Sequence, residues 1–354
     1  MRLSYMKLKR KLFSPAIFGF LLSVFISGEV YAASENEKVV NLYSSRHYGV
    51  DNELFELFKK QSGIKVNLLQ IKEASQMIER IKSEGKKSPA DVIITVDIGN
   101  AWKAENADLF QPIKTDLLQK SVPSNLVEEN FSWYAITLRG RAIVYDKTKI
   151  KENEIQNYED LSNEKFKGKV LARTSNHVYN QSLVASLIQA NGEEKTKIWC
   201  EKFTNNLARK PEGGDIDQMK AIYNGKGEIA IVNTYYYARL LKSEDPEDQK
   251  VVKNLGIIFP NQANRGMHIN ASIAGIAKYA PNKENGIKLI EFLVSKDAQE
   301  ILAKMNNEYP VRTDVEWTNV LKNMGKPKFD TVTLSKVGEN TPKAIMILDQ
   351  VGWR

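Results

Sequence analysis

Short apolar runs alternate with amphipathic stretches over the first third of the chain. The apolar runs predict strands at residues 39–43, 64–68 and 91–96. Apolar residues at helical spacing predict two helices between them: one capped by Asp51 or Asn52 and ended by Gly63, and one over residues 73–83. This alternation implies parallel strands with right-handed crossovers, so we expect one α/β lobe here.

The pattern changes at residues 133–146, where two apolar segments predict a long extended chain that crosses between lobes. A second α/β series is predicted to follow, with elements at 169–172, 180–190, 193–206, 215–224 and 228–232. The chain is then predicted to return through elements at 256–260, 271–277, 282–302 and a helix that Thr341 caps and Pro342 begins.

The predicted architecture is therefore α/β with two lobes, a hinge and a ligand cleft between the lobes. We expect lobe 1 to comprise residues 33–135 together with 260–354, and lobe 2 to comprise residues 136–259.

Three consecutive tyrosines, Tyr235, Tyr236 and Tyr237, follow the strand predicted at 228–232. In open α/β sheets, ligands bind at the carboxyl ends of strands. A buried phenol needs a hydrogen-bond partner or a metal, and a bend after Thr234 would turn two phenols toward one point. Such a pair would suit a hard, highly charged cation. A packed aromatic cluster is the alternative, and the tyrosine run alone leaves both open.

The N-terminus has the pattern of a secretory signal peptide. Five basic residues among the first eleven precede a mostly apolar stretch at 13–26, and Val30-Tyr31-Ala32 provides small residues for cleavage after Ala32. We expect residues 1–32 to be removed and the protein to reside in the periplasm. An uncleaved membrane anchor is the alternative.

Charge and cysteine content argue against two other classes of protein. Loss of residues 1–32 would lower the formal net charge from +8 to +4, and no basic cluster is interleaved with aromatics, which argues against nucleic-acid binding. The single Cys200 lies in a stretch of helical apolar spacing, as a buried small hydrophobe would. A nucleophilic Cys200 would need a base, and the adjacent sequence offers only Glu201 and lysines. We expect a monomeric binding protein, not an enzyme.

Several segments, in order along residues 39–311, carry a resemblance to a known family: LYSSRHY (42–48), PADV (89–92), LRGR (138–141), NTYYYAR (233–239), RGMHIN (265–270) and IEFLVS (290–295). The chain resembles the iron-binding periplasmic proteins of ferric-ion ABC importers, in their cyanobacterial-type branch. The resemblance implies a two-lobed periplasmic binding protein fold. It also implies the substrate-binding component of an iron(III) importer, which delivers Fe³⁺ to an inner-membrane permease and its ATPase.

The resemblance also implies site residues. The family's paired ligand tyrosines correspond to Tyr235 and Tyr236, its tyrosine after the first strand to Tyr48, and its tyrosine from the second lobe to Tyr179. His47 occupies a position that supplies a ligand in some relatives and not in others. These five residues are the predicted metal ligands, and Tyr237 is expected to pack or to support its neighbours.

The chemistry of iron agrees with these implied ligands. Fe³⁺ prefers anionic oxygen, and a phenol with a pKa of about 10 loses its proton readily only beside a metal. Binding should therefore release protons; Fe²⁺ stays open as a second ligand. Four phenolates on Fe³⁺ leave one net negative charge, which Arg239 is predicted to offset. The alternatives are a binding protein for another small solute and an iron-sequestering protein without a transport role.

Overall fold

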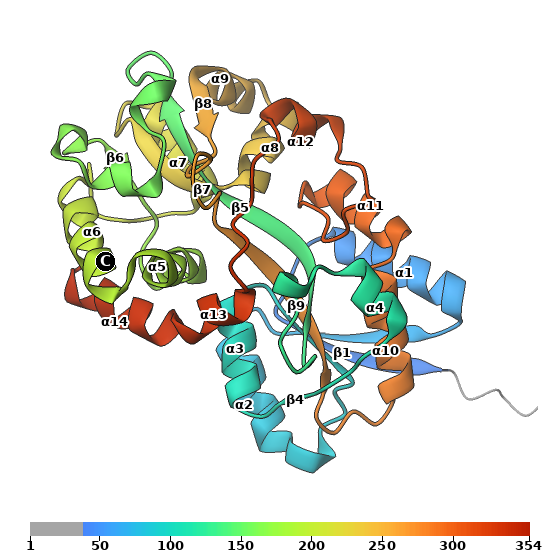
Figure 1. Cartoon of the computed structure of the whole chain (residues 1–354). Coiled ribbons are helices and arrows are strands. Elements are labelled where there is room, and N and C mark those ends of the chain that lie inside the picture. Colours follow the sequence, from blue (N-terminus) through green and yellow to red (C-terminus); the bar gives the residue numbers. More distant parts are fainter. Residues whose placement is uncertain (1–37) are drawn as a thin grey trace, which may run out of the picture. The chain divides into compact units, whose positions relative to one another are not determined.

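A single path of hydrogen-bonded strands runs through the protein in the order β2-β1-β3-β9-β5-β7-β6, with β4 paired to β9 and β8 to β5 (Figure 1). The computed structural model describes residues 38–354, so the predicted signal peptide lies outside the described residues. The strands are β1 (Val39–Ser44), β2 (Lys65–Gln70), β3 (Val92–Thr95), β4 (Phe110–Gln111), β5 (Tyr134–Asp146), β6 (Val170–Leu171), β7 (Ile229–Asn233), β8 (Leu255–Ile258) and β9 (Ile269–Ala277).

The first three strands are parallel, as predicted: β1 pairs with β2 on one side and with β3 on the other. The helix between β1 and β2, α1 (Val50–Ser62), ends at Gly63 with a φ of 69°, which confirms the predicted stop. The predicted capping by Asp51 or Asn52 is wrong, because α1 begins at Val50 with Gly49 as its N-cap. The Asp51 carboxylate instead accepts a hydrogen bond from Arg46 Nε at 2.8 Å.

Strand β5 is the long extended segment that the sequence predicted. All of its 13 residues are buried. Its first half pairs with β9, and its second half pairs with β7 and β8, so one strand belongs to both halves of the sheet. We call β5 the crossing strand.

The pairing of the crossing strand with β9 contains a bulge. Ala135 lies opposite Ile273 and Thr137 lies opposite Ser272, so Ile136 is an extra residue on β5. The Ile136 carbonyl accepts a hydrogen bond from Gln299 Nε2 at 2.7 Å. Beyond the bulge the register is regular, with Leu138 opposite Ala271, Arg139 opposite Asn270 and Gly140 opposite Ile269.

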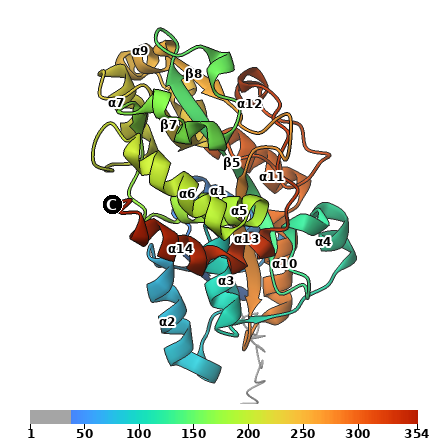
Figure 2. The same cartoon turned by 60° about the vertical axis from the view of Figure 1, so that its left-hand side comes forward.

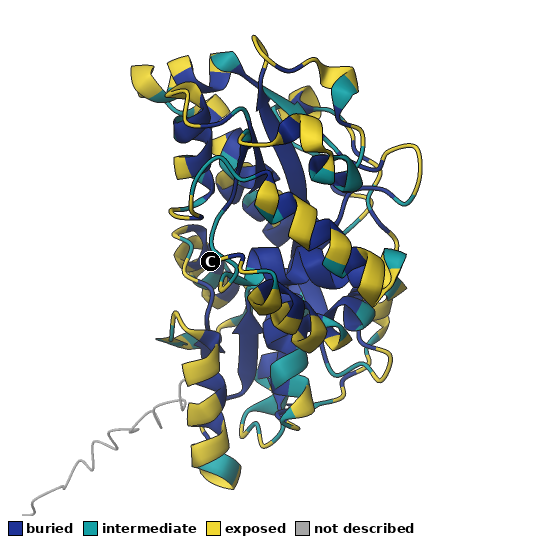
Figure 3. Ribbon diagram, turned by 90° about the vertical axis from the view of Figure 1, so that its left-hand side faces the viewer, coloured by how far each residue is buried: buried dark blue, intermediate teal, exposed yellow. Residues whose placement is uncertain are grey.

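Helices cover the sheet, and their exposed residues lie on outer surfaces while the strands are largely buried (Figure 3). The other α-helices are α2 (Ala74–Glu84), α3 (Ile98–Asn106), α4 (Asp116–Ser121), α5 (Val178–Asn191), α6 (Glu193–Asn205), α7 (Asp215–Tyr223), α8 (Thr234–Lys242), α9 (Pro246–Asn254), α10 (Lys283–Leu293), α11 (Lys296–Asn306), α12 (Asn319–Met324), α13 (Leu334–Glu339) and α14 (Thr341–Gln350). Short 3₁₀ turns are η1 (Gly85–Lys87), η2 (Ser124–Leu126), η3 (Glu152–Glu154), η4 (Tyr158–Ser162) and η5 (Glu164–Phe166).

Two helical predictions differ from the structure. The helix expected over 282–302 is two helices, α10 and α11, because Ser295 caps α11 by accepting a hydrogen bond from the Ala298 backbone N–H. The last helix, α14, begins at Thr341 with Asn340 as its N-cap, one residue before the predicted start. No helix among residues 38–354 is long and apolar enough to cross a membrane.

The C-terminal segment packs on elements from both predicted lobes. Helix α13 contacts α3 and α5, and α14 runs beside α5 and α6 (Figure 2). Trp353 stacks on Phe203 with ring centroids 4.4 Å apart, and its indole N–H donates to the Arg173 carbonyl at 2.8 Å. The predicted boundaries of the two lobes stay a prediction.

Candidate metal centre

The tyrosine run lies at the end of a buried strand, as the sequence predicted. Strand β7 ends at Asn233 and α8 begins at Thr234, so the bend expected after Thr234 is the start of a helix. Tyr235 is fully buried and Tyr236 is half-buried. Tyr237 is turned elsewhere: its hydroxyl donates to the Leu255 carbonyl at 3.1 Å, so it packs as expected.

Phenols from three separate segments meet at Tyr235. Tyr48 follows β1, and its hydroxyl oxygen is 3.5 Å from that of Tyr235. Tyr179, in the first turn of α5, brings its hydroxyl oxygen to 3.0 Å from the same atom. The rings of Tyr235 and Tyr236 lie side by side with centroids 4.2 Å apart. All four predicted tyrosines therefore lie in one cluster.

His47 lies at the edge of this cluster. Its ring is exposed and stacks on Tyr48 with centroids 5.5 Å apart. Its Nδ1 is 3.3 Å from the Ser45 carbonyl oxygen. The contacts of His47 are thus with the main chain and with a ring face, while the phenol oxygens meet farther inside.

Arg239 lies over the rings of the tyrosine pair. It is exposed on α8, and its guanidinium carbon is 5.3 Å from the Tyr236 ring centroid and 6.0 Å from that of Tyr235. Its contact is therefore with the aromatic faces, and the structure describes no hydrogen bond from Arg239 to a phenol oxygen.

A second arginine, Arg139 of the crossing strand, lies deeper than Arg239. It is buried, and its guanidinium carbon is 5.4 Å from the Tyr179 ring centroid. Within residues 38–354 its three side-chain nitrogens have no hydrogen-bond partner. Its nearest carboxylate oxygen, Asp97 Oδ2, is 3.7 Å away and already accepts a hydrogen bond from Asn270. Arg139 is thus ion-paired with Asp97 while its N–H donors stay unsatisfied. Buried donors without acceptors are costly, so they mark a place where an anionic acceptor is expected.

Burial sets the acidity of the tyrosine cluster. It raises the pKa of Tyr235 well above the ordinary value and that of Tyr236 to about 12. It also raises the pKa of Tyr48 and Tyr179, while the Arg139 charge lowers the pKa of both. Burial acts against the charged form of Arg139, but the phenols and Asp97 raise its pKa above the ordinary value. Without a bound cation, all four phenols are protonated near neutral pH.

A buried ionic network fixes Tyr179 and the end of β7. Asp215 accepts hydrogen bonds from Arg141 at 2.9 Å, from Arg173 at 3.3 Å and from the Asn233 backbone N–H at 2.8 Å. Arg141 also donates to the Asn180 side chain at 2.9 Å, next to Tyr179. Two guanidinium groups share the single Asp215 carboxylate, so the network both positions the phenols and carries one excess positive charge beside Tyr179.

Arg46 fixes Tyr48 in the same manner. Its guanidinium carbon lies 4.5 Å from the Tyr48 ring centroid. Its nitrogens donate to Asp51 at 2.8 Å, to Glu308 at 2.8 Å and to Ser272 of β9 at 2.9 Å. The loop that carries Tyr48 is therefore tied to the sheet by a fully buried side chain.

The donors of this cluster suit a hard cation. Among the described residues, no three His, Cys, Asp or Glu side chains gather where they could hold a metal. Four phenol oxygens with a buried cation behind them are what the site offers, and phenolates are anionic oxygen donors once deprotonated. His177 caps α5, where its Nδ1 accepts a hydrogen bond from the Tyr179 backbone N–H.

Comparison with known proteins gives the family. Residues 87–330 match the family described as bacterial extracellular solute-binding protein. The chain belongs to this family. The resemblance inferred from the sequence is thereby confirmed, as is the prediction of a binding protein rather than an enzyme.

Its relatives within the solute-binding family include iron proteins of cyanobacteria. The chain is 46% identical to iron uptake protein A1 of Synechocystis, over 90% of this chain and 88% of that protein. It is 42% identical to iron uptake protein A2 of the same organism, over 91% and 92% of the two chains. A solved Trichodesmium structure, in complex with iron and citrate, has 46% identity and a TM-score of 0.86 over 89% of this chain and 100% of that one. The predicted α/β periplasmic binding protein fold is confirmed.

Proposed function

We propose that this protein binds Fe³⁺ through the phenolate oxygens of Tyr48, Tyr179, Tyr235 and Tyr236. The observation that carries the proposal is the meeting of hydroxyls from three segments at Tyr235, at 3.5 Å and 3.0 Å. The similarity to Synechocystis proteins named for iron uptake, and to a Trichodesmium protein solved with iron, supports the same ligand.

Charge balance supports this set of ligands. Four phenolates carry four negative charges, which Fe³⁺ and one guanidinium neutralise. Arg139 is suited to contribute to this balance because it is buried beside the phenols and its N–H groups have no hydrogen-bond partner in the described structure, although it is 3.7 Å from Asp97. Arg141 and Arg173, which share the Asp215 carboxylate beside Tyr179, supply further positive charge. Arg239 is exposed and contacts ring faces, so we assign it a smaller influence on the bound iron.

His47 is left outside the proposed set. Its ring is exposed and its Nδ1 lies against the Ser45 carbonyl. Fe²⁺ would place one positive charge fewer among four phenols, so Fe³⁺ is the preferred ion. The citrate in the Trichodesmium structure belongs to that protein, and no anion is included in the shell proposed here.

We further propose that the protein acts in the periplasm, as a monomer, after removal of residues 1–32. It would deliver Fe³⁺ to an inner-membrane permease and its ATPase. The family description as an extracellular solute-binding protein, the names of the cyanobacterial relatives and the signal-peptide pattern at 1–32 support this role.

A visible absorption spectrum of the purified mature protein, titrated with ferric citrate, tests the proposal. Phenolate-to-iron charge transfer gives a visible band that the protein alone does not have. A band that saturates at about one iron per chain is the expected result, since the four phenols form one cluster. Iron that elutes separately from a colourless protein would overturn the proposal and favour another small solute.

A further inference from the structure

A pocket of about 620 Å³ lies apart from the tyrosines. None of Tyr48, Tyr179, Tyr235 or Tyr236 lines it. Its walls come from the segment at 123–126, from two strand residues, and from the chain between 310 and 331. The volume is within the range of small-molecule sites, roughly 300–1,000 Å³.

The pocket lies on the opposite face of the crossing strand from the tyrosine cluster. Leu138 of β5 and Ile269 of β9 line the pocket, while Arg139, the next residue on β5, lies beside the Tyr179 ring. Successive side chains of a strand point to opposite faces. The crossing strand therefore contributes to both sites, with one face to each.

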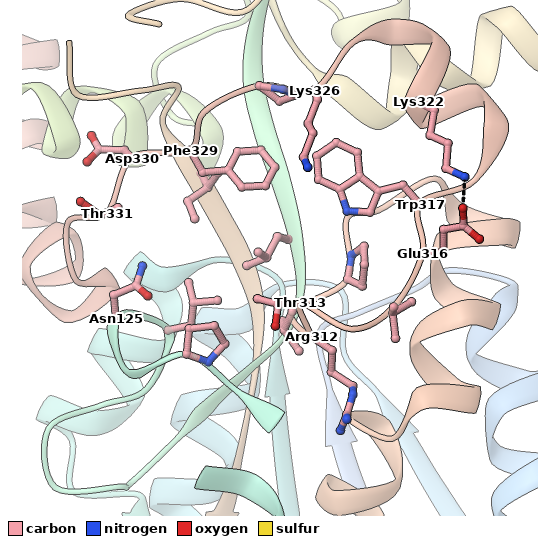
Figure 4. A pocket seen from close by; sticks show the side chains of 18 residues that line it. Asn125, Arg312, Thr313, Glu316, Trp317, Lys322, Lys326, Phe329, Asp330 and Thr331 are labelled. Carbon is pink, nitrogen blue, oxygen red and sulfur yellow. Dashed lines mark hydrogen bonds and ion pairs between the residues drawn. The ribbon is translucent and has the colours of Figure 1, made fainter. Parts of the chain in front are cut away.

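The walls of the pocket are mainly apolar, with two aromatic rings. Figure 4 shows Trp317 and Phe329 on either side, with the Lys326 side chain running down beside the Trp317 ring. These rings are half-buried, and each packs on the buried ring of Tyr309, with centroids 4.8 Å and 5.0 Å apart. Tyr309 is held in turn by two backbone hydrogen bonds to Leu138, at 2.8 Å and 2.9 Å. The aromatic wall is thus fixed by the core.

Most charges around the pocket are already paired. Arg312 donates to Asp314 and to Ser121, at 2.7 Å and 2.5 Å, and Lys322 pairs with Glu316. Asp330 is paired with Arg265 at 2.8 Å. The structure describes no such partner for Lys326, nor for the side chains of Asn125, Thr313 and Thr331. The pocket therefore offers one free cation and three neutral hydrogen-bonding groups around an apolar surface.

From this geometry we propose that the pocket is a second ligand site, which takes a small organic monoanion with a flat apolar body. The apolar body packs against Trp317, Phe329, Val311 and Leu138, and the carboxylate meets the Lys326 ammonium. This site can bind its ligand without iron, because it shares no side chain with the tyrosine cluster.

Calorimetric titration with 2-naphthoate tests the proposal, using the mature protein without added iron. We expect saturable binding with a Kd at or below about 1 mM, as is typical of a ligand of this size. Lys326→Met keeps the apolar stem and removes the charge, so it should weaken binding about fivefold. Lys288→Met is the matched control, since Lys288 is an exposed lysine on α10 outside the pocket and should bind as the wild type does.

The neutral analogue 2-naphthamide isolates the charge interaction. It should bind the wild type and Lys326→Met equally, so that the cycle of two ligands and two proteins assigns the fivefold effect to the carboxylate–ammonium pair. Thr331→Trp places an indole at an exposed position on the pocket wall and should abolish binding of both ligands.

Two calorimetric results would overturn the proposal. One is the absence of saturable 2-naphthoate binding up to about 10 mM, well above the expected range. The other is binding that Lys326→Met and Thr331→Trp leave unchanged. The indole N–H signal of Trp317, assigned with Trp317→Phe, should shift on titration; a shift confined to the other four tryptophans would also reject this site.

Discussion

Leu138 and Arg139 are neighbours on the crossing strand, yet one lines an apolar pocket and the other lies buried among phenols. On the pocket side, charged groups are almost all paired and the surface is dominated by aliphatic and aromatic carbon. On the tyrosine side, a cation has no hydrogen-bond partner in the described structure, and phenols approach one another within 3.5 Å. Buried polar groups without partners indicate the charge and the donor type of the ligand that a site takes, whereas apolar walls indicate only the shape of that ligand.

A fall in pH should have the largest effect on the difference between the two sites, because it should weaken iron binding and leave binding in the pocket almost unchanged. Burial keeps the phenols protonated, with the pKa of Tyr236 raised to about 12, so each phenolate that binds iron must release a proton. Iron affinity should then fall about tenfold per pH unit for each phenol, or about 10,000-fold per unit for all four. Competition with a chelator of known pH dependence measures the slope. A flat slope would contradict phenolate ligation. The affinity for 2-naphthoate should hardly change between about pH 7 and 6, because its binding displaces no phenol proton.

Removal of the central hydroxyl should have the next largest effect. Tyr235→Phe is expected to weaken iron binding at least about 100-fold, since a lost ligand exceeds the 10- to 100-fold typical of an outer-shell partner. Tyr237→Phe is the matched control, because its hydroxyl bonds the Leu255 carbonyl. Equal iron affinities of the two variants would remove Tyr235 from the site.

The two arginines can be compared directly. Arg139→Gln should weaken iron binding about 10- to 100-fold, because the phenolates lose a buried positive charge beside them and Asp97 loses its ion-pair partner. Arg139→Lys should restore part of the loss. Arg239→Gln should cost less than about fivefold, as expected of an exposed charge. If Arg239→Gln has the larger effect and Arg139→Gln is silent, the exposed arginine is the balancing cation.

The smallest effect should be the thermodynamic coupling between iron binding at the tyrosine cluster and 2-naphthoate binding in the pocket. In the structure, the pocket is formed while the phenols lie together, so a pocket ligand should favour that arrangement. Saturating 2-naphthoate is therefore expected to raise iron affinity about two- to fivefold, and iron should raise 2-naphthoate affinity by the same factor. Lys326→Met should reduce the effect at a fixed ligand concentration. Identical iron titrations with and without the ligand would show that the two faces act independently.

The sequence predicted those parts of the site that follow from local pattern. The apolar run before Tyr235 placed the tyrosines at a strand end, and the crossing strand was expected from two adjacent apolar segments. Tyr48 and Tyr179 came from the resemblance alone, because no local rule connects Tyr235 with residues that lie 187 and 56 positions before it, respectively.

Arg139 and the pocket were not predicted, for related reasons. An arginine within an apolar segment indicates that a negative group lies nearby, since a buried guanidinium needs a counter-charge. The sequence does not identify that group, because it lies on a distant segment. The pocket is built from chain near 125, 138, 269 and 310–331, so its shape depends on tertiary packing. The break between α10 and α11 was missed because apolar spacing continues across Ser295, where the cap decides the boundary.

The bulge at Ile136 has a consequence for how this chain tolerates insertions and deletions. The extra residue sets the phase of the strand, so that odd-numbered Arg139 and Arg141 face the phenols and even-numbered Leu138 faces the pocket. Deleting one residue between Ile136 and Leu138 would exchange the two faces, with a leucine among the phenols and a guanidinium in the apolar pocket. A point substitution can change either site by itself, but a one-residue change in the register of this strand would destroy both sites at once.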